Sequence, residues 1–413
     1  MRHGHFACAL KVGTRFWAAV WLFWPAAAAA QATLFPPDQL TRIQQGVRDI
    51  YNMEYSRAAE IFQRMIQNAP DDPAGYAYLA MTCWIEELSA KQELSIERFA
   101  SSDFFEENPK YRPKVDPAVE ERFRKLNRQA IDKAWAQIKK DPNDRAALFL
   151  HGLAYQNLAS FEASLKRNWW PAFRAGDRTY SDHKKLLRMD PDFQDARLSV
   201  GAYDYVSGSL PWHIKLVAML LGKWGDKERG RRELETVAEK GVLAADDARI
   251  LLILIYTREK NYPKALQYLS ELHRKYPHNY LVHLDMGGIA LLMKVPDRAI
   301  EIYQEILRNR DAGKPEYSEL ERAFLYNRLG VAFRHKKELE TSAVWFRKAL
   351  QADGLSQRAA TVAHLELGKT LDLMGQREEA LRNYQVVVSA EDIAGTQAEA
   401  QRLLRKRYRA SGV

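Results

Sequence analysis

The sequence predicts an all-α protein, folded as a right-handed superhelical solenoid of about eight helix hairpins. Small residues, aromatic residues and prolines recur at fixed offsets, and Ala265 and Ala299 are 34 residues apart. A unit of this length is one helix pair, which cannot bury its apolar face alone and must stack on its neighbours. We found no segment with the pattern of a strand. The chain is therefore expected to offer an extended surface, and such surfaces usually bind a partner.

The C-terminal region, residues 246–413, contains the most regular hairpins. Units begin near residues 246, 280, 323 and 361. In the third of these, Gly330 lies on the first helix, and Phe346 and Ala349 lie on the second. Small residues allow two helices to cross closely, and an aromatic side chain fills the space beside them. A proline such as Pro277 ends a second helix.

The N-terminal region, residues 31–245, follows the same pattern with additions. Three consecutive units are too long between the end of the first helix and the start of the second, at 83–130, 155–179 and 204–230. In a stacked solenoid these turns line one edge, and insertions on one face often mark a binding face. We expect the first insertion, around residues 89–118, to form loop and short helix.

The second and third insertions are rich in aromatic and aliphatic residues. The candidate residues for a patch on the inserted edge are Trp169, Trp170, Leu210, Pro211 and Trp212. Two interpretations are compatible with this composition. The residues either form an exposed interaction patch, or they fold back and extend the core of the solenoid.

The 34-residue pattern resembles the tetratricopeptide repeat family over nearly all of the chain after residue 30. The resemblance implies a helical solenoid whose ligands lie on the concave face, which the first helices form. It implies little about the ligand, because the fold serves many unrelated binding roles. A shorter block, residues 201–234, resembles a eukaryotic tetratricopeptide family of the mitochondrial outer membrane and cytosol that is linked to inclusion clearance and lipid handling. Its glycines include Gly201, Gly225 and Gly230.

If the first helices line a groove, positions two, five, nine and twelve of each helix are expected to face it. The candidate groove residues are Met81, Trp84, Phe149, Tyr205, Leu254, Leu284, Asn327, Arg334 and Lys369. Most groove positions are apolar, which suits an amphipathic helix or an acyl chain. The same stripe is also typical of ordinary helix packing. Asn327, Arg334 and Lys369 form the candidate polar contact set.

Residues 1–30 have the pattern of a secretory signal peptide. Basic residues precede an apolar run from Phe16 to Ala30, which ends in consecutive alanines. We therefore expect an exported protein of the periplasm or cell envelope, with an uncleaved anchor as the alternative. The net charge is +9. A basic tail at 402–409 is compatible with a solvated capping helix or with attraction to an anionic membrane or partner.

The sequence predicts no enzyme, no cofactor and no metal site. Gly368-Lys369-Thr370 lies within an expected helix, where no phosphate-binding loop can form. His273, His278 and His283 are five residues apart, a spacing that does not place them on one metal. The leading hypothesis is a scaffold that binds a protein or peptide segment in its concave groove. The alternative is a lipid-binding or membrane-associated protein, and nucleic acid is not an expected partner.

Overall fold

The computed structural model describes residues 34–90, 115–209, 225–393 and 395–409. These residues form helices and no strand, which confirms the all-α prediction. None of the described helices combines the length and apolarity needed to cross a membrane. The candidate signal peptide and the candidate patch residues Leu210, Pro211 and Trp212 lie outside the described residues.

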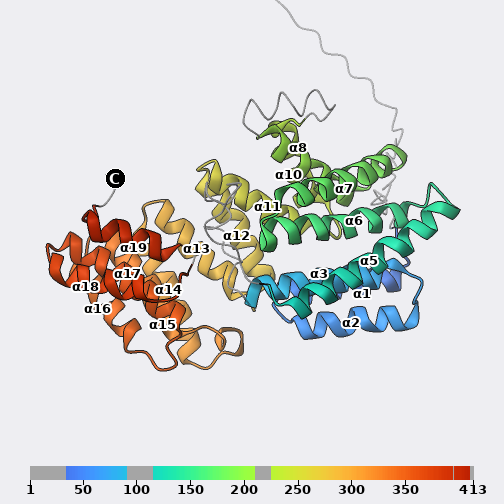
Figure 1. Ribbon diagram of the computed structural model, residues 1–413. Coiled ribbons are helices and arrows are strands. Elements are labelled where there is room, and N and C mark those ends of the chain that lie inside the picture. Colours follow the sequence, from blue (N-terminus) through green and yellow to red (C-terminus); the bar gives the residue numbers. More distant parts are fainter. Residues whose placement is uncertain (1–33, 91–114, 210–224, 394, 410–413) are drawn as a thin grey trace, which may run out of the picture.

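Consecutive helices pair as hairpins, and each hairpin packs on the next to form a curved solenoid (Figure 1). A single helix, α19 (Thr396–Arg405), packs on the last hairpin. The pairs are α1 (Pro37–Tyr51) with α2 (Tyr55–Asn68), α3 (Pro73–Ala90) with α5 (Pro117–Lys140), α6 (Arg145–Phe161) with α7 (Trp169–Met189), α8 (Arg197–Gly208) with α10 (Lys227–Lys240), α11 (Ala245–Arg258) with α12 (Tyr262–Lys275), α13 (Tyr280–Leu292) with α14 (Pro296–Asp311), α15 (Arg322–His335) with α16 (Leu339–Leu350), and α17 (Gln357–Leu373) with α18 (Arg377–Ser389).

Glycine and aromatic residues form the centre of each regular hairpin. Gly330 of α15 lies against the ring of Phe346 of α16, and a Cβ atom on this glycine would be 2.6 Å from Cε1 of the ring. Gly287 meets Tyr303 in the preceding hairpin in the same way. Both aromatic side chains are fully buried. The recurring glycine therefore marks the position in the first helix where an aromatic ring of the second helix occupies the volume that a larger side chain would fill.

The described parts of the second insertion are built into longer helices. After α6 the chain makes a π-helical turn, Glu162–Lys166, and α7 begins at Trp169. The rings of Phe123 and Phe161 stack with centroids 4.3 Å apart at this end of the hairpins. Together with Leu88 and Leu165 they form a separate buried cluster. The extra residues of these hairpins thus contribute core.

The glycines of the block at 201–234 allow two helix backbones to touch. A Cβ atom on Gly230 of α10 would be 2.4 Å from the backbone nitrogen of Tyr205 and 2.5 Å from the carbonyl oxygen of Gly201, both on α8. The guanidinium of Arg229 donates to both oxygens of the buried Asp204 at 2.8 and 2.9 Å. The described residues of this block therefore hold α8 and α10 at close range.

We expect Gly330→Ala to destabilise the protein, although alanine is the better helix former. The added methyl group must displace Phe346 from a packed core, and such overpacking costs about 1–3 kcal/mol. The double variant Gly330→Ala/Phe346→Leu should recover part of this loss. Gly176→Ala is the matched control: it lies within α7 with no atom near its Cβ position, and it should stabilise the helix by about 0.5–1 kcal/mol. Urea unfolding monitored by circular dichroism measures all three, and equal effects at both glycines would contradict the packing argument.

Candidate functional site

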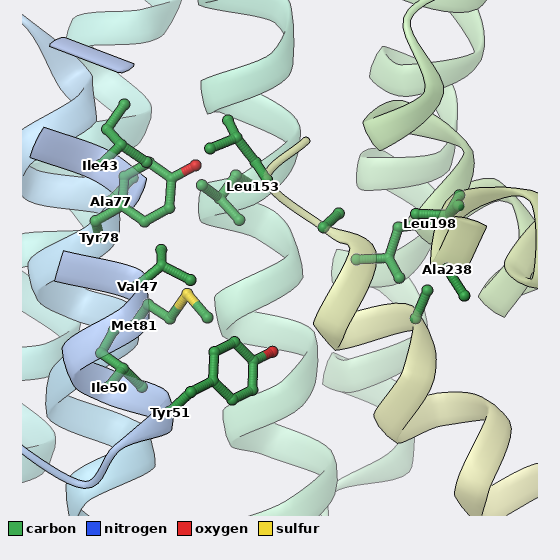
Figure 2. Packing of buried hydrophobic residues seen from close by; sticks show 14 of the residues in the cluster. Ile43, Val47, Ile50, Tyr51, Ala77, Tyr78, Met81, Leu153, Leu198 and Ala238 are labelled. Carbon is green, nitrogen blue, oxygen red and sulfur yellow. The ribbon is translucent and has the colours of Figure 1, made fainter. Parts of the chain in front are cut away.

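The inner face of the N-terminal hairpins is filled by helix α1. Ile43, Val47 and Ile50 of α1 are buried in one cluster with Met81 of α3 and Leu153 of α6 (Figure 2). The largest buried cluster runs from Phe35 to Ile289 and includes these three residues. It also includes three predicted groove residues, Met81, Phe149 and Tyr205, which are all buried.

The C-terminal end of α1 is attached to hairpins far along the chain. The hydroxyl of Tyr51 donates to the carboxylate of Asp247 in α11, a separation of 196 residues. The Tyr51 ring stacks on the ring of Tyr276, with centroids 5.0 Å apart. The side-chain amide of Asn279 donates to the carbonyl oxygen of Tyr51 at 2.7 Å. We call this contact of Tyr51 with Asp247, Tyr276 and Asn279 the clasp, and it closes the first turn of the solenoid into a ring.

A small cavity remains at the centre of this ring. Its volume is about 20 Å³, and its lining includes Tyr78, Gln156, His183 and Asp247. A volume of this size holds about one water molecule and no larger ligand. A peptide or acyl chain therefore has no space on this inner face while α1 occupies it.

The polar groups around the cavity are largely satisfied within the chain. Asp195 accepts hydrogen bonds from the backbone nitrogens of residues 242, 243 and 244 at 2.8, 3.0 and 2.9 Å. His183 lies 2.6 Å from the hydroxyl of Ser199 and 3.0 Å from the carbonyl oxygen of Phe149. Burial lowers the pKa of His183, so the ring is held neutral. These contacts connect neighbouring hairpins.

The inner face of the C-terminal hairpins is more open. Phe324 and Val331 of α15 and Val362 of α17 are half-buried.

The remaining groove candidates differ in exposure. Trp84 and Leu254 are half-buried, whereas Leu284 and Asn327 are buried. The side-chain amide of Asn327 donates to the carbonyl oxygen of Ala359 at 2.9 Å, which ties α15 to α17.

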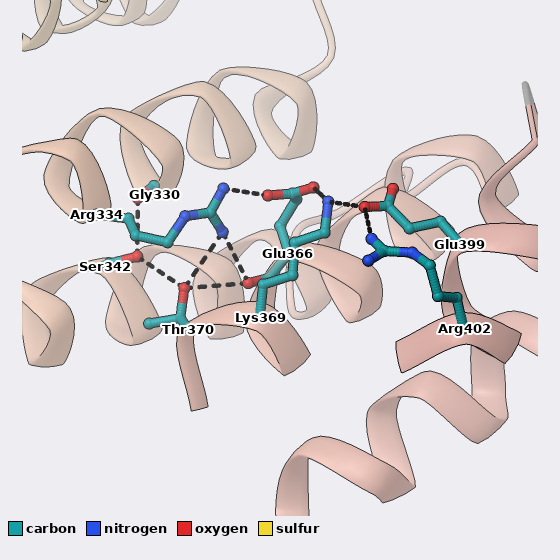
Figure 3. Close-up of polar contacts among 8 residues, drawn as sticks. All are labelled: Gly330, Arg334, Ser342, Glu366, Lys369, Thr370, Glu399 and Arg402. Atoms are coloured by element: carbon teal, nitrogen blue, oxygen red, sulfur yellow. Dashed lines mark hydrogen bonds and ion pairs between the residues drawn. The ribbon is translucent and has the colours of Figure 1, made fainter. Parts of the chain in front are cut away.

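The two candidate cations of the groove belong to a network inside the protein (Figure 3). Arg334 is paired with the carboxylate of Glu366 and donates to the Glu366 carbonyl oxygen at 3.1 Å. Lys369 lies 2.7 Å from the Glu366 carboxylate and 3.0 Å from that of Glu399. Burial alone would raise the pKa of the Glu366 carboxyl, but the two cations, Arg334 and Lys369, lower this pKa to about 2. A ligand carboxylate at this place would compete with Glu366.

The C-terminal tail packs against the same hairpin. Leu403 of α19 is fully buried, and Arg407 donates to the carbonyl oxygen of Asp372 at 2.7 Å through Nε. The backbone nitrogen of Tyr408 donates to the Asp372 carboxylate at 2.8 Å. The Tyr408 ring lies 5.9 Å from the charged groups of Arg334 and Lys369. These contacts match the capping interpretation of the tail.

The described candidates of the inserted edge, Trp169 and Trp170, begin helix α7. Trp169 is half-buried, whereas Trp170 is 67% exposed. The Trp170 ring is 6.2 Å from the ring of Phe173, which lies 6.1 Å from that of Tyr203 in α8. Trp170 is therefore at the exposed end of an aromatic row that joins two hairpins.

Consecutive helix hairpins that stack on one another define a helical repeat scaffold. A sequence model of the family described as tetratricopeptide repeat matches residues 256–323. These residues of the chain are therefore similar to tetratricopeptide repeats. The Hsp70-Hsp90 organising protein of Plasmodium falciparum (isolate 3D7) is 28% identical over 112 residues, which cover 27% of this chain and 19% of that protein. The match thus spans about a fifth of this curated relative.

Solved structures with a similar course of the chain include two further proteins. PilF of Pseudomonas aeruginosa is 16% identical, and the match covers 64% of this chain and 99% of that chain with a TM-score of 0.34. Yeast Tom70 is 12% identical, and the match covers 89% of this chain and 88% of that chain with a TM-score of 0.35.

The clasp was not predicted from the sequence. Locally, Asp246 and Asp247 lie in the first turn of α11, where a carboxylate favours the helix dipole. The contact of Asp247 with Tyr51 has no local signal, because the two residues are 196 positions apart.

We expect Asp247→Asn to stabilise the protein increasingly as the pH rises from about 4 to 7. Burial, with a contribution from the nearby carboxylates of Asp246 and Asp195, raises the pKa of Asp247 to about 7 from its usual 3.8. The unfolded chain releases this proton near pH 3.8, so the folded state loses relative stability up to about pH 7. Asparagine keeps an acceptor for Tyr51 and has no such cost. Urea unfolding at pH 5 and pH 8 measures the difference.

Asp246→Asn provides the matched control with the opposite sign. Burial alone would raise the pKa of Asp246, but hydrogen bonds from the side chains of Lys275 and Tyr276 hold this pKa below its usual value. Its stabilising contribution is present above pH 3.8 and is lost as the pH falls through the lower folded value. This variant should therefore be less stable than the parent at pH 8. If Asp247→Asn and Asp246→Asn changed the stability in the same direction at pH 8, the opposite pKa shifts assigned to the two carboxyl groups would be contradicted.

We expect Arg334→Ala to lower the free energy of unfolding by about 3 kcal/mol at pH 7, because it removes one partner of a buried charge. The loss should shrink below pH 4.5 and vanish toward pH 2, since Glu366 has its folded pKa at about 2 and its ordinary value at 4.5. Arg322→Ala breaks an exposed ion pair with Asp311, and solvent screening makes the contribution of such a pair to stability much smaller. Equal losses in the two variants, measured by urea unfolding, would show that the network is not a buried one.

Proposed function

We propose that the protein is an exported scaffold that binds an amphipathic or extended segment of a partner protein along the inner face of its C-terminal hairpins. The observation that carries this proposal is the contrast between the two inner faces. Helix α1 fills the N-terminal inner face, and its apolar residues Ile43, Val47 and Ile50 are buried there. On the C-terminal inner face, Phe324, Val331 and Val362 are half-buried.

Helix α1 also indicates which kind of segment suits such a face. Its apolar residues recur at intervals of three and four, so one side of the helix joins the buried cluster that also contains residues of α3 and α6. A partner helix with the same spacing would cover the half-buried residues of α15 and α17 in a similar way. Part of the chain is similar to the Hsp70-Hsp90 organising protein, whose name describes the organising of two other proteins, and this similarity supports a protein as the partner.

Export is the second part of the proposal and rests on residues 1–30. A basic start, an apolar run and terminal alanines favour a cleaved signal peptide and a location in the periplasm or envelope. The N-terminal residue of the protein isolated from cells tests this part directly. A start near Gln31 would support it, and an intact Met1 on cytoplasmic protein would contradict it.

The lipid alternative has less structural support at the inner face. Leu284 is buried, with 6% of its surface exposed, so a charge at this position would test folding before it tested lipid binding. Leu254 is half-buried and remains a suitable position for such a test. The cavity in the N-terminal ring is too small for an acyl chain, since ligand pockets are generally larger than about 300 Å³.

We expect a photo-crosslinking amino acid at Val362 to form a covalent adduct with one discrete protein in cells. The same amino acid at Val386, exposed on the outer side of α18, is the control and should give no such adduct. Val362→Glu should abolish capture of the crosslinked protein, while Val386→Glu should leave it unchanged. Circular dichroism spectra of both variants verify folding. Adducts at Val386 alone, or unchanged capture by a folded Val362→Glu variant, would count against the inner face.

A further inference from the structure

The outer sides of α5 and α7 form a continuous exposed surface. On α7 the exposed residues Trp170, Arg174, Lys184 and Arg188 follow helical spacing. This stripe is about 27 Å long at the rise of an α-helix. It meets α5 at Trp135, whose ring lies 5.6 Å from the guanidinium of Arg178 of α7. We call the exposed residues of these two helices the α5–α7 outer face.

This face has a large excess of positive charge. Its exposed ionisable residues are eight cations and two acids, Glu121 and Asp132. Both acids are on α5. The cations are Arg122, Lys125, Arg128, Lys139 and Lys140 on α5 and Arg174, Lys184 and Arg188 on α7. The whole chain has a net charge of +9, so these two helices account for a large part of it.

Several of these cations are not neutralised by neighbouring side chains. Among the described residues, Lys125, Arg128, Arg174 and Arg188 form no ion pair, in contrast to Arg124 on the same helix, which is paired with Glu162 at 2.7 Å. Unpaired cations that outnumber the acids around them create a positive potential that attracts an anionic surface.

The same face exposes large apolar side chains. Trp170 is 67% exposed, Trp135 41% and Met189 36%. No other tryptophan of the described residues is exposed. Tryptophan is enriched where one end of a side chain meets hydrocarbon and the other meets water and headgroups. An acidic protein would pair the cations but would need a pocket for Trp170, whereas the interface of an anionic membrane accepts both groups at once.

We propose that the α5–α7 outer face docks on the surface of an anionic phospholipid membrane. The cations lie against the lipid phosphates, and Trp170 enters the boundary between headgroups and acyl chains. The contact is peripheral. It uses the second helices of two hairpins, whereas the proposed partner face uses first helices, so the protein can hold a partner while it lies on the membrane. The inference does not depend on the proposed groove function.

Vesicle co-sedimentation of the full-length chain tests this surface. The vesicles contain phosphatidylcholine alone or phosphatidylcholine with 30% phosphatidylglycerol, a composition chosen at about the charge of a biological membrane. Binding to neutral vesicles measures the contribution of the apolar segment at 16–30, which does not depend on lipid charge. The readout is therefore the affinity for anionic vesicles divided by the affinity for neutral vesicles. The triple variant Lys125→Glu/Arg128→Glu/Arg174→Glu is expected to reduce that ratio at least about tenfold, because each cation near an anionic surface contributes about fivefold.

The matched control reverses three exposed cations on the outer sides of other second helices: Arg308→Glu/Lys348→Glu/Arg382→Glu. It changes the net charge equally and should change the ratio by less than about threefold, because it leaves the charges of the docking face in place. Trp170→Ala should weaken binding to anionic vesicles severalfold without altering the melting temperature, since its side chain is mostly exposed.

Three outcomes would overturn the proposal. The first is an equal loss in the two triple variants, which would indicate only a general charge effect. The second is a ratio near one for the parent protein. The third is unchanged binding by Trp170→Ala together with tight, salt-sensitive binding of the same face to DNA or to polyglutamate, which would make the surface a site for another polyanion.

Discussion

The clasp between α1 and the fifth and sixth hairpins determines which inner face of the solenoid is buried and which is left open to a partner. Repeated hairpins of this kind curve, and the curve can stay open or close on itself. Here Tyr51 closes it, because its hydroxyl reaches Asp247 and its ring stacks on Tyr276. The interior of the first turn then becomes a core with a cavity of about 20 Å³. A face that would otherwise bind a partner is occupied by the chain itself.

The two halves of the solenoid consequently differ in how they are held together. One buried cluster joins Phe35 to Ile289, so the N-terminal hairpins share their core across many units. The C-terminal hairpins have separate clusters, and each joins neighbouring units only. In such a region stability is close to a sum of nearest-neighbour terms. Contacts between first helices, such as the Arg334–Glu366 pair, therefore matter more there.

The local parts of the fold could be predicted from the sequence, and the closure could not. Gly330 and Phe346 lie in one hairpin, so their spacing in the chain reflects their contact in space. The burial of Phe149 depends instead on where α1 lies, which is set by small rotations accumulated over several hairpins. Helical spacing predicts that Met81 and Phe149 face the inner side, but it contains no information about what covers that side. The pairing of Lys369 with Glu366 is local, because residues three apart lie on one face of a helix.

The lengthened hairpins connect the closed ring to the exposed outer face. Helices α5 and α7 have 24 and 21 residues, whereas α16 and α18 have 12 and 13. The ring of Phe123 on α5 stacks on that of Phe161 at the end of α6, and α7 packs along α6. On the outer side of α5 and α7, Arg122, Lys125 and Trp170 are exposed to water. A core alone explains the inner side of these turns. It does not explain why the outer side combines exposed tryptophan with few acids, and a surface selected only for solubility would mix both signs of charge and bury its aromatic residues.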